Sequence, residues 1–77
     1  AAEYGSINAL TGPVERRDMS TVKSHINCLD GCDRLMYELL ALRLCEMGEL
    51  KNENADYENM KKYLKREIRN ETIGSDI

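Results

Sequence analysis

The sequence predicts an all-α fold: one long amphipathic helix and a shorter second helix form a helical hairpin, which a second chain completes as a dimeric helical bundle or coiled coil. Three observations support this prediction. The 77 residues include no Phe or Trp and a single Pro, while the good helix formers Leu, Glu, Lys, Arg, Met and Ala are plentiful. Apolar residues recur three and four positions apart over most of the chain. One polar stretch, residues 51–56, interrupts this spacing.

Residues 1–12 are rich in small and polar side chains, and this composition predicts a flexible lead-in. Pro13 suits the first turn of a helix, where its missing N–H group leaves no hydrogen bond unmade. Thr11, Asp18 and Ser20 are each suitable N-caps. The first helix is therefore expected to begin between residues 13 and 20.

A helix over residues 18–52 is predicted by an apolar arc that covers about half of a helical wheel. Asp30-Gly31 is a turn signal by itself, but Gly31 falls on the polar side and the apolar phase continues through it. We therefore expect one continuous helix, in which Gly31 costs about 1 kcal/mol relative to Ala. A break at Asp30-Gly31, which would give three helices, is the alternative. The arc consists of Val22, Ile26, Cys28, Leu29, Cys32, Leu35, Met36, Leu39, Leu40, Met47 and Leu50.

A polar loop is expected at residues 52–55 and a shorter helix at residues 56–70. We expect the two helices to form a single helical domain over residues 13–72, with a frayed tail at residues 73–77. The second helix carries a narrower apolar stripe, at spacings of three and four, made of Tyr57, Met60, Leu64 and Ile68.

The unequal lengths of the two helices imply a partner. At 1.5 Å per residue, the first helix would be about 50 Å long and the second about half that. A hairpin would therefore leave much of the apolar arc exposed, and contiguous exposed stripes mark interaction sites. We predict a non-enzymatic protein–protein association module, a homodimer or higher oligomer, with a different helical partner as the alternative. Its association face consists of Ile26, Leu29, Leu35, Met36, Leu39, Leu40, Met47 and Leu50.

A basic cluster in the second helix supports a different hypothesis. The net charge of −3 argues against a general affinity for nucleic acid, but this cluster forms one cationic helix face. Three interpretations of this face remain open: it is exposed to solvent, it packs against the acidic side of a partner helix, or it contacts phosphates. The alternative function is therefore a small nucleic-acid-binding domain of helix-turn-helix type. The cluster consists of Lys61, Lys62, Lys65, Arg66 and Arg69.

The three cysteines and the single histidine suggest a weak metal site. His25, Cys28 and Cys32 lie three and four positions apart, so one helix face would present all three. They lack the paired close spacings of zinc fingers, and we expect no metal. The odd number of cysteines argues against a disulfide framework. It favours buried, reduced thiols in an intracellular protein.

No sequence motif of a catalytic or cofactor site is present. The chain has a single His, no Gly-rich phosphate loop and no nucleophile elbow. No apolar run approaches the ~20 residues of a membrane span. We therefore expect neither enzymatic activity nor a cofactor, and no membrane insertion.

Overall fold

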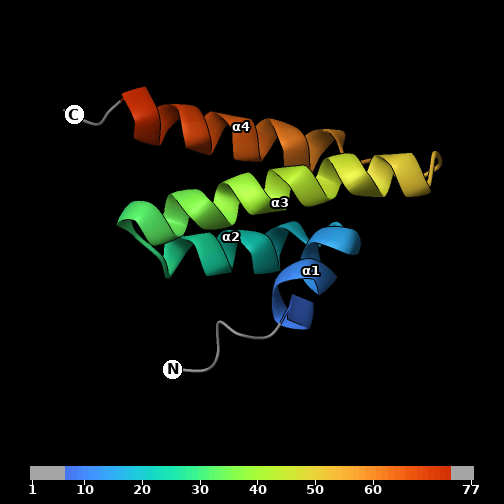
Figure 1. The fold of residues 1–77 in the computed structure, drawn as a ribbon, viewed down its shortest axis with the longest axis horizontal. Helices are drawn as coiled ribbons and strands as arrows, with labels where there is room; N and C mark the ends of the chain where they lie inside the picture. Colours follow the sequence, from blue (N-terminus) through green and yellow to red (C-terminus); the bar gives the residue numbers. More distant parts are fainter. Residues whose placement is uncertain (1–6, 74–77) are drawn as a thin grey trace.

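The structure, a computed structural model, describes residues 7–73. The described chain forms four helices and no strand: α1 (Ile7–Glu15), α2 (Met19–Asn27), α3 (Gly31–Lys51) and α4 (Glu58–Ile73). The all-helical prediction is confirmed. In Figure 1, α3 lies in the middle, with α4 antiparallel along one side and α1 and α2 on the other. Residues 1–6 and 74–77, which include most of the predicted tail, lie outside the described part of the chain.

The predicted flexible lead-in is wrong for residues 7–12, because they begin helix α1. Pro13 lies near the end of this helix and not in its first turn. The end is a Schellman motif: the Asp18 N–H donates to the Pro13 carbonyl at 2.8 Å, and the Arg17 N–H to the Val14 carbonyl at 3.0 Å. Arg17 has a φ of +58°. The motif reverses the chain, so α2 packs against α1.

The predicted continuous helix over residues 18–52 is also wrong, and the alternative break at Asp30-Gly31 is observed. Helix α2 begins after Asp18, whose side chain accepts from the Thr21 N–H at 3.2 Å, and it ends at Asn27. Asp30 is extended, with φ −148° and ψ 170°, and Gly31 has a φ of +58°. Glycine tolerates this left-handed conformation without steric cost. The chain therefore folds back, and α2 lies against α3.

Helices α3 and α4 form a hairpin whose close approach depends on Gly48. A Cβ atom at Gly48 would lie 2.6 Å from Cζ of Tyr57, so the tyrosine ring rests on the backbone of α3. The Tyr57 hydroxyl donates to the Glu15 carbonyl at 3.2 Å. Asp56 accepts from the Glu58 N–H at 3.0 Å at the start of α4. One tyrosine therefore joins α1 to the α3–α4 hairpin.

All four helices contribute to one core. The predicted stripe of α4 lies largely inside it, because Tyr57, Met60 and Leu64 are buried, while Ile68 is half-buried. None of the helices is long and apolar enough to cross a membrane, within the residues the structure describes. The core consists of Val14, Val22, Ile26, Ala41, Cys45, Tyr57, Met60 and Leu64.

Candidate protein interface

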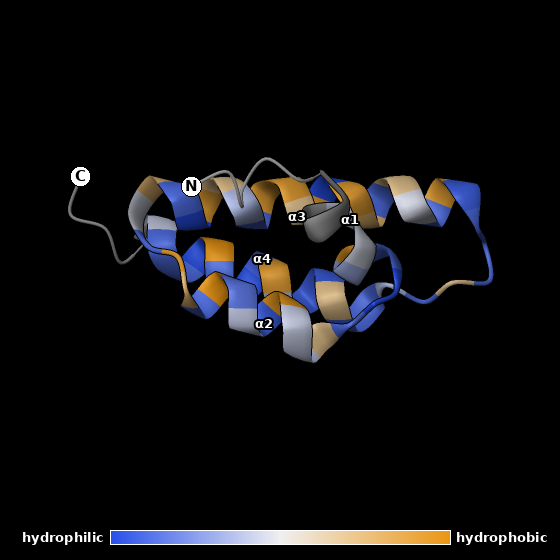
Figure 2. Ribbon diagram, turned by 90° about the horizontal axis from the view of Figure 1, so that it is seen from below, coloured by the Kyte–Doolittle hydropathy of each residue, from blue (hydrophilic) through white to orange (hydrophobic). Residues whose placement is uncertain are grey.

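Helix α3 has an apolar surface that the rest of the chain does not cover. Leu50 is 84% exposed and Met36 is 67% exposed, with Leu39, Leu40 and Met47 each about half exposed. Figure 2 shows hydrophobic segments recurring along the whole length of α3. We call this surface the α3 outer face; it consists of Met36, Leu39, Leu40, Arg43, Met47 and Leu50.

The outer face has the spacing of a coiled-coil seam. Five of its positions follow one another at intervals of four, three, four and three residues along α3. Such spacing keeps side chains on one side of a helix and suits packing against a second helix. The five positions are Met36, Leu40, Arg43, Met47 and Leu50.

The opposite side of α3 explains why these large apolar residues remain outside. It buries Ala41, Cys45 and Glu38, and Gly48 continues it beneath the Tyr57 ring. Small residues let α4 approach the axis of α3 closely, so this side faces the core. The large apolar residues, half a turn away, face solvent.

One ion pair lies on the outer face. Arg43 Nη1 lies 3.1 Å from Glu46 Oε1 within the same helix, and the two side chains are 67% and 46% exposed. An exposed pair of this kind contributes little to the stability of a single chain. Its charges therefore remain free to interact with a partner.

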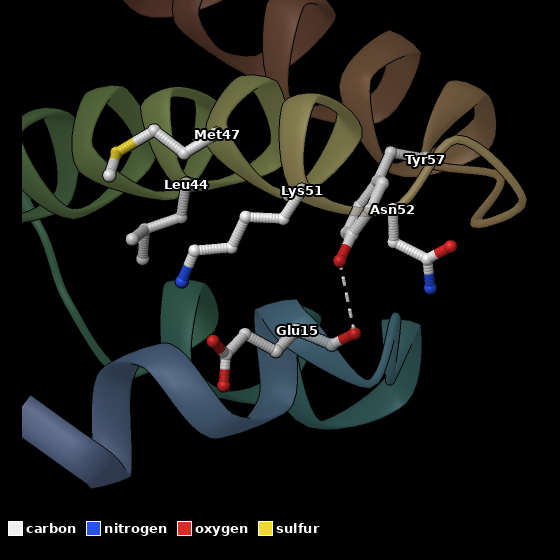
Figure 3. Close-up of a pocket in the computed structure, with 7 residues that line it drawn as sticks. Glu15, Leu44, Met47, Lys51, Asn52 and Tyr57 are labelled. Atoms are coloured by element: carbon white, nitrogen blue, oxygen red, sulfur yellow. Dashed lines mark hydrogen bonds between the residues drawn. The ribbon is translucent and has the colours of Figure 1, made fainter.

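An open pocket of about 170 Å³ continues the outer face towards α1. Met47 belongs to both surfaces. Figure 3 shows Leu44 and Lys51 extending from α3 towards α1, with the Tyr57 hydroxyl directed at the Glu15 backbone oxygen. The pocket is lined by Glu15, Leu44, Met47, Gly48, Lys51, Asn52 and Tyr57.

Three of the predicted association residues do not lie on the outer face. Ile26 is fully buried in the chain's own core, which corrects its expected place in the association face. Leu29 and Leu35 are half-buried. The break after α2 causes this change, because α2 folds back and turns its apolar residues inward. Five predicted residues remain together on the outer face: Met36, Leu39, Leu40, Met47 and Leu50.

The basic cluster of α4 is divided by an ion pair. Lys61 Nζ lies 2.9 Å from Glu49 Oε2 of α3 and 3.5 Å from Glu58 Oε1. Its hydrogen bond with Glu49 is the main reason that the pKa of Lys61 is raised. Lys61 therefore joins the two helices of the hairpin. The other four cations are exposed: Lys62, Lys65, Arg66 and Arg69.

The weak metal candidates do not form a common site. His25 Nδ1 lies 3.0 Å from the Tyr37 hydroxyl, and the two rings pack edge to face. Cys28 and Cys32 are exposed, contrary to the expectation of buried thiols, while Cys45 is buried. No group of three or more His, Cys, Asp or Glu side chains in the described part of the chain is arranged to hold a metal ion.

A buried carboxylate between α3 and α4 was missed by the sequence analysis. Glu38 does not belong to the predicted apolar arc, yet it is fully buried. Arg34 Nε lies 3.2 Å from Glu38 Oε2 and 3.2 Å from Glu71 Oε2. Arg34 Nη2 lies 2.7 Å from Glu67 Oε1. Burial raises the pKa of Glu38 to about 7, helped by the Glu71 carboxylate and opposed by Arg34. The spacing of Arg34 and Glu38, four residues apart, was the one signal of this cluster.

Two carboxylate oxygens in this cluster lack a hydrogen bond. Within the described residues, Glu38 Oε1 and Glu71 Oε2 are buried and make no hydrogen bond, although Arg34 Nε lies 3.2 Å from Glu71 Oε2. Arg34 supplies one positive charge for three carboxylates, so a proton on Glu38 would reduce the excess negative charge. We interpret the cluster as a link between α3 and α4 that is sensitive to pH.

Comparison with known protein families identifies a family that resembles the first part of the chain. Residues 1–44 match a protein family described as a domain of unknown function, DUF2520. This match covers 44 of the 77 residues and includes α1, α2 and α3 as far as Leu44. No curated protein and no solved structure shows a significant match to the chain. The chain therefore belongs to the DUF2520 family.

Proposed function

We propose that this chain is a non-enzymatic association module that binds a second copy of itself through the α3 outer face. The observation that carries the proposal is the exposure of Met36 and Leu50 at the two ends of a stripe with coiled-coil spacing. Contiguous exposed apolar surface of this kind marks interaction sites in soluble proteins. A second α3 has the matching spacing and length.

The size of the face implies a weak dimer. Covering the exposed apolar side chains of the outer face contributes about 1 kcal/mol per side chain, on the order of 10 kcal/mol for the two copies together. Association itself costs about 4–15 kcal/mol. We therefore expect dissociation in the micromolar range or above, so that the dimer forms and dissociates with concentration.

Sedimentation velocity over a wide concentration range tests the proposal. We expect the sedimentation coefficient to rise with concentration in reducing buffer. Leu50→Asp should abolish this rise and leave the helical circular dichroism unchanged, because Leu50 is 84% exposed. Lys62→Asp is the control on α4, where a change at an exposed position outside the outer face should leave association intact. A folded wild-type monomer at every concentration would contradict the proposal.

The exposed cations of α4 favour a second candidate, nucleic-acid binding. Lys62, Lys65, Arg66 and Arg69 lie on a helix whose other side packs on α3. The two helices of a helix-turn-helix cross at about 90–120°, whereas α3 and α4 lie side by side and antiparallel (Figure 1). Any binding would therefore use phosphate contacts and weaken steeply with salt. The absence of retardation of DNA or RNA at low salt would rule it out.

A further inference from the structure

We infer that two copies of the chain pair with their α3 outer faces antiparallel, about a two-fold axis that crosses the outer face at the level of residue 45 along the helix. This inference rests on the proposed self-association and specifies its geometry. It also assigns a role to Arg43 and Glu46, which interact across the two-fold axis and determine the direction of pairing.

The apolar side chains favour this axis. In an antiparallel pair, residues at equal distances on either side of the axis lie opposite one another. With the axis at Cys45, Leu40 lies opposite Leu50 of the partner subunit, five residues away on the other side. Met47 then lies opposite Arg43 of the partner subunit, against its aliphatic stem. The most exposed leucine of the chain is thereby covered by another leucine.

Charge complementarity favours the antiparallel direction. A parallel pair would place the two copies of Arg43 at the same level, and likewise the two copies of Glu46, so that like charges would repel. The antiparallel pair brings Arg43 within one residue of the level of Glu46 of the partner subunit. Because Arg43 and Glu46 are already 3.1 Å apart in one chain, the dimer would contain four alternating charges.

The same charges argue against the next antiparallel register. A shift of half a heptad moves the axis to a point between Ala41 and Leu42. Arg43 would then lie six residues from the level of Glu46 of the partner subunit, too far for an ion pair. Asp33 would lie opposite Leu50 of the partner subunit, so a charge would face the most exposed apolar side chain. The register about Cys45 avoids both, and it places Met36 beyond the end of α3 of the partner subunit.

Charge reversal separates contacts between chains from contacts within a chain. We expect Arg43→Glu and Glu46→Arg each to weaken self-association about tenfold, since each makes the four charges alike in sign. An equimolar mixture of the two variants should associate as well as the wild type, because opposite charges then meet only across the interface. If the mixture stays as weak as the single variants, the inferred contact is wrong.

Disulfide trapping determines the register. In a background with the exposed Cys28 and Cys32 changed to Ser, Leu40→Cys and Leu50→Cys are made as separate variants and mixed under mild oxidation. Disulfides need Cα atoms within about 7 Å. We expect crosslinked dimers in the mixture, each joining one Leu40→Cys chain to one Leu50→Cys chain. Neither variant should crosslink by itself, because its two thiols lie on opposite sides of the axis.

The outcomes distinguish the inference from the proposed function. Crosslinking of Leu40→Cys with itself would show parallel pairing and overturn the inferred geometry. A wild-type dimer whose mixed variants do not crosslink would also overturn the geometry, while self-association would stand. A wild-type monomer at every concentration would remove both.

Discussion

The two sides of α3 differ in a way that opposes the usual distribution of apolar residues. The inner side faces the core with Ala41, Cys45 and a fully buried Glu38, whereas the outer side carries Met36 and Leu50 exposed to solvent. Side-chain size orients this helix, because small residues allow α4 to pack closely against it. The comparison teaches that a single helix can turn small side chains towards the core and leave its large apolar side chains at the surface.

The largest expected difference in the free energy of unfolding is between a substitution in the core and one on the outer face. Leu64 of α4 is fully buried in the core, so Leu64→Ala should lower the free energy of unfolding by about 2–5 kcal/mol. Leu50→Ala should change it by about 0.5 kcal/mol or less. Urea denaturation followed by circular dichroism, at concentrations where the wild type is monomeric, measures both. Equal losses would mean that the outer face belongs to the core.

A smaller effect on stability is expected from alanine substitution at Gly48 in α3, with Gly12 in α1 as the control. Gly48→Ala places a Cβ atom 2.6 Å from the Tyr57 ring, and we expect a loss of about 1–3 kcal/mol. Gly12→Ala is the matched control, since its Cβ atom would meet the end of the Arg16 side chain at 3.1 Å, which is free to move. That variant should be neutral or stabilised by up to about 1 kcal/mol. Thermal unfolding of both variants tests the close approach of α3 and Tyr57.

The smallest expected effect on the free energy of unfolding comes from the titration of Glu38 on the inner side of α3. The pKa of Glu38 is about 7 in the folded chain, above its ordinary value of 4.5. The folded state therefore holds the proton more tightly. The resulting stabilisation is fully present below pH 4.5 and is lost as pH rises through 7. Relative to Glu38→Gln, the wild type should lose on the order of 1–2 kcal/mol between pH 4.5 and 8. Parallel profiles for the two proteins in urea denaturation would contradict this.

Several features of the fold could be predicted from the sequence because they depend on local signals. Helix-forming composition predicted the all-helical fold, and the Asp18 carboxylate caps a helix as one of three expected candidates. The stripe of α4 was predicted from its spacing, and three of its four residues are buried. Propensity and periodicity act over a few residues, so a single sequence reveals them.

The break between α2 and α3 was predicted only as the alternative, because a helical wheel does not distinguish residues that face the core from residues that face solvent. Val22 and Ile26 point into the core of the chain, whereas Met36 and Leu40 point out of it. The three linker residues Cys28–Asp30 happen to preserve the phase between these two sets. A continuous apolar arc therefore resulted from two helices that bury different sides. For the same reason the predicted arc does not include Glu38, which is buried on the inner side of α3.

The contact between Tyr57 and Glu15 has a consequence for the order of folding. It joins residues 42 positions apart in the sequence, whereas α3 and α4 meet across a short loop. Contacts between distant residues form slowly because a long loop must close first. We expect the α3–α4 hairpin to assemble early and present the Tyr57 hydroxyl, and α1 to dock onto it late. The N-terminal helix would then be the first part of the molecule to detach in native-state hydrogen exchange.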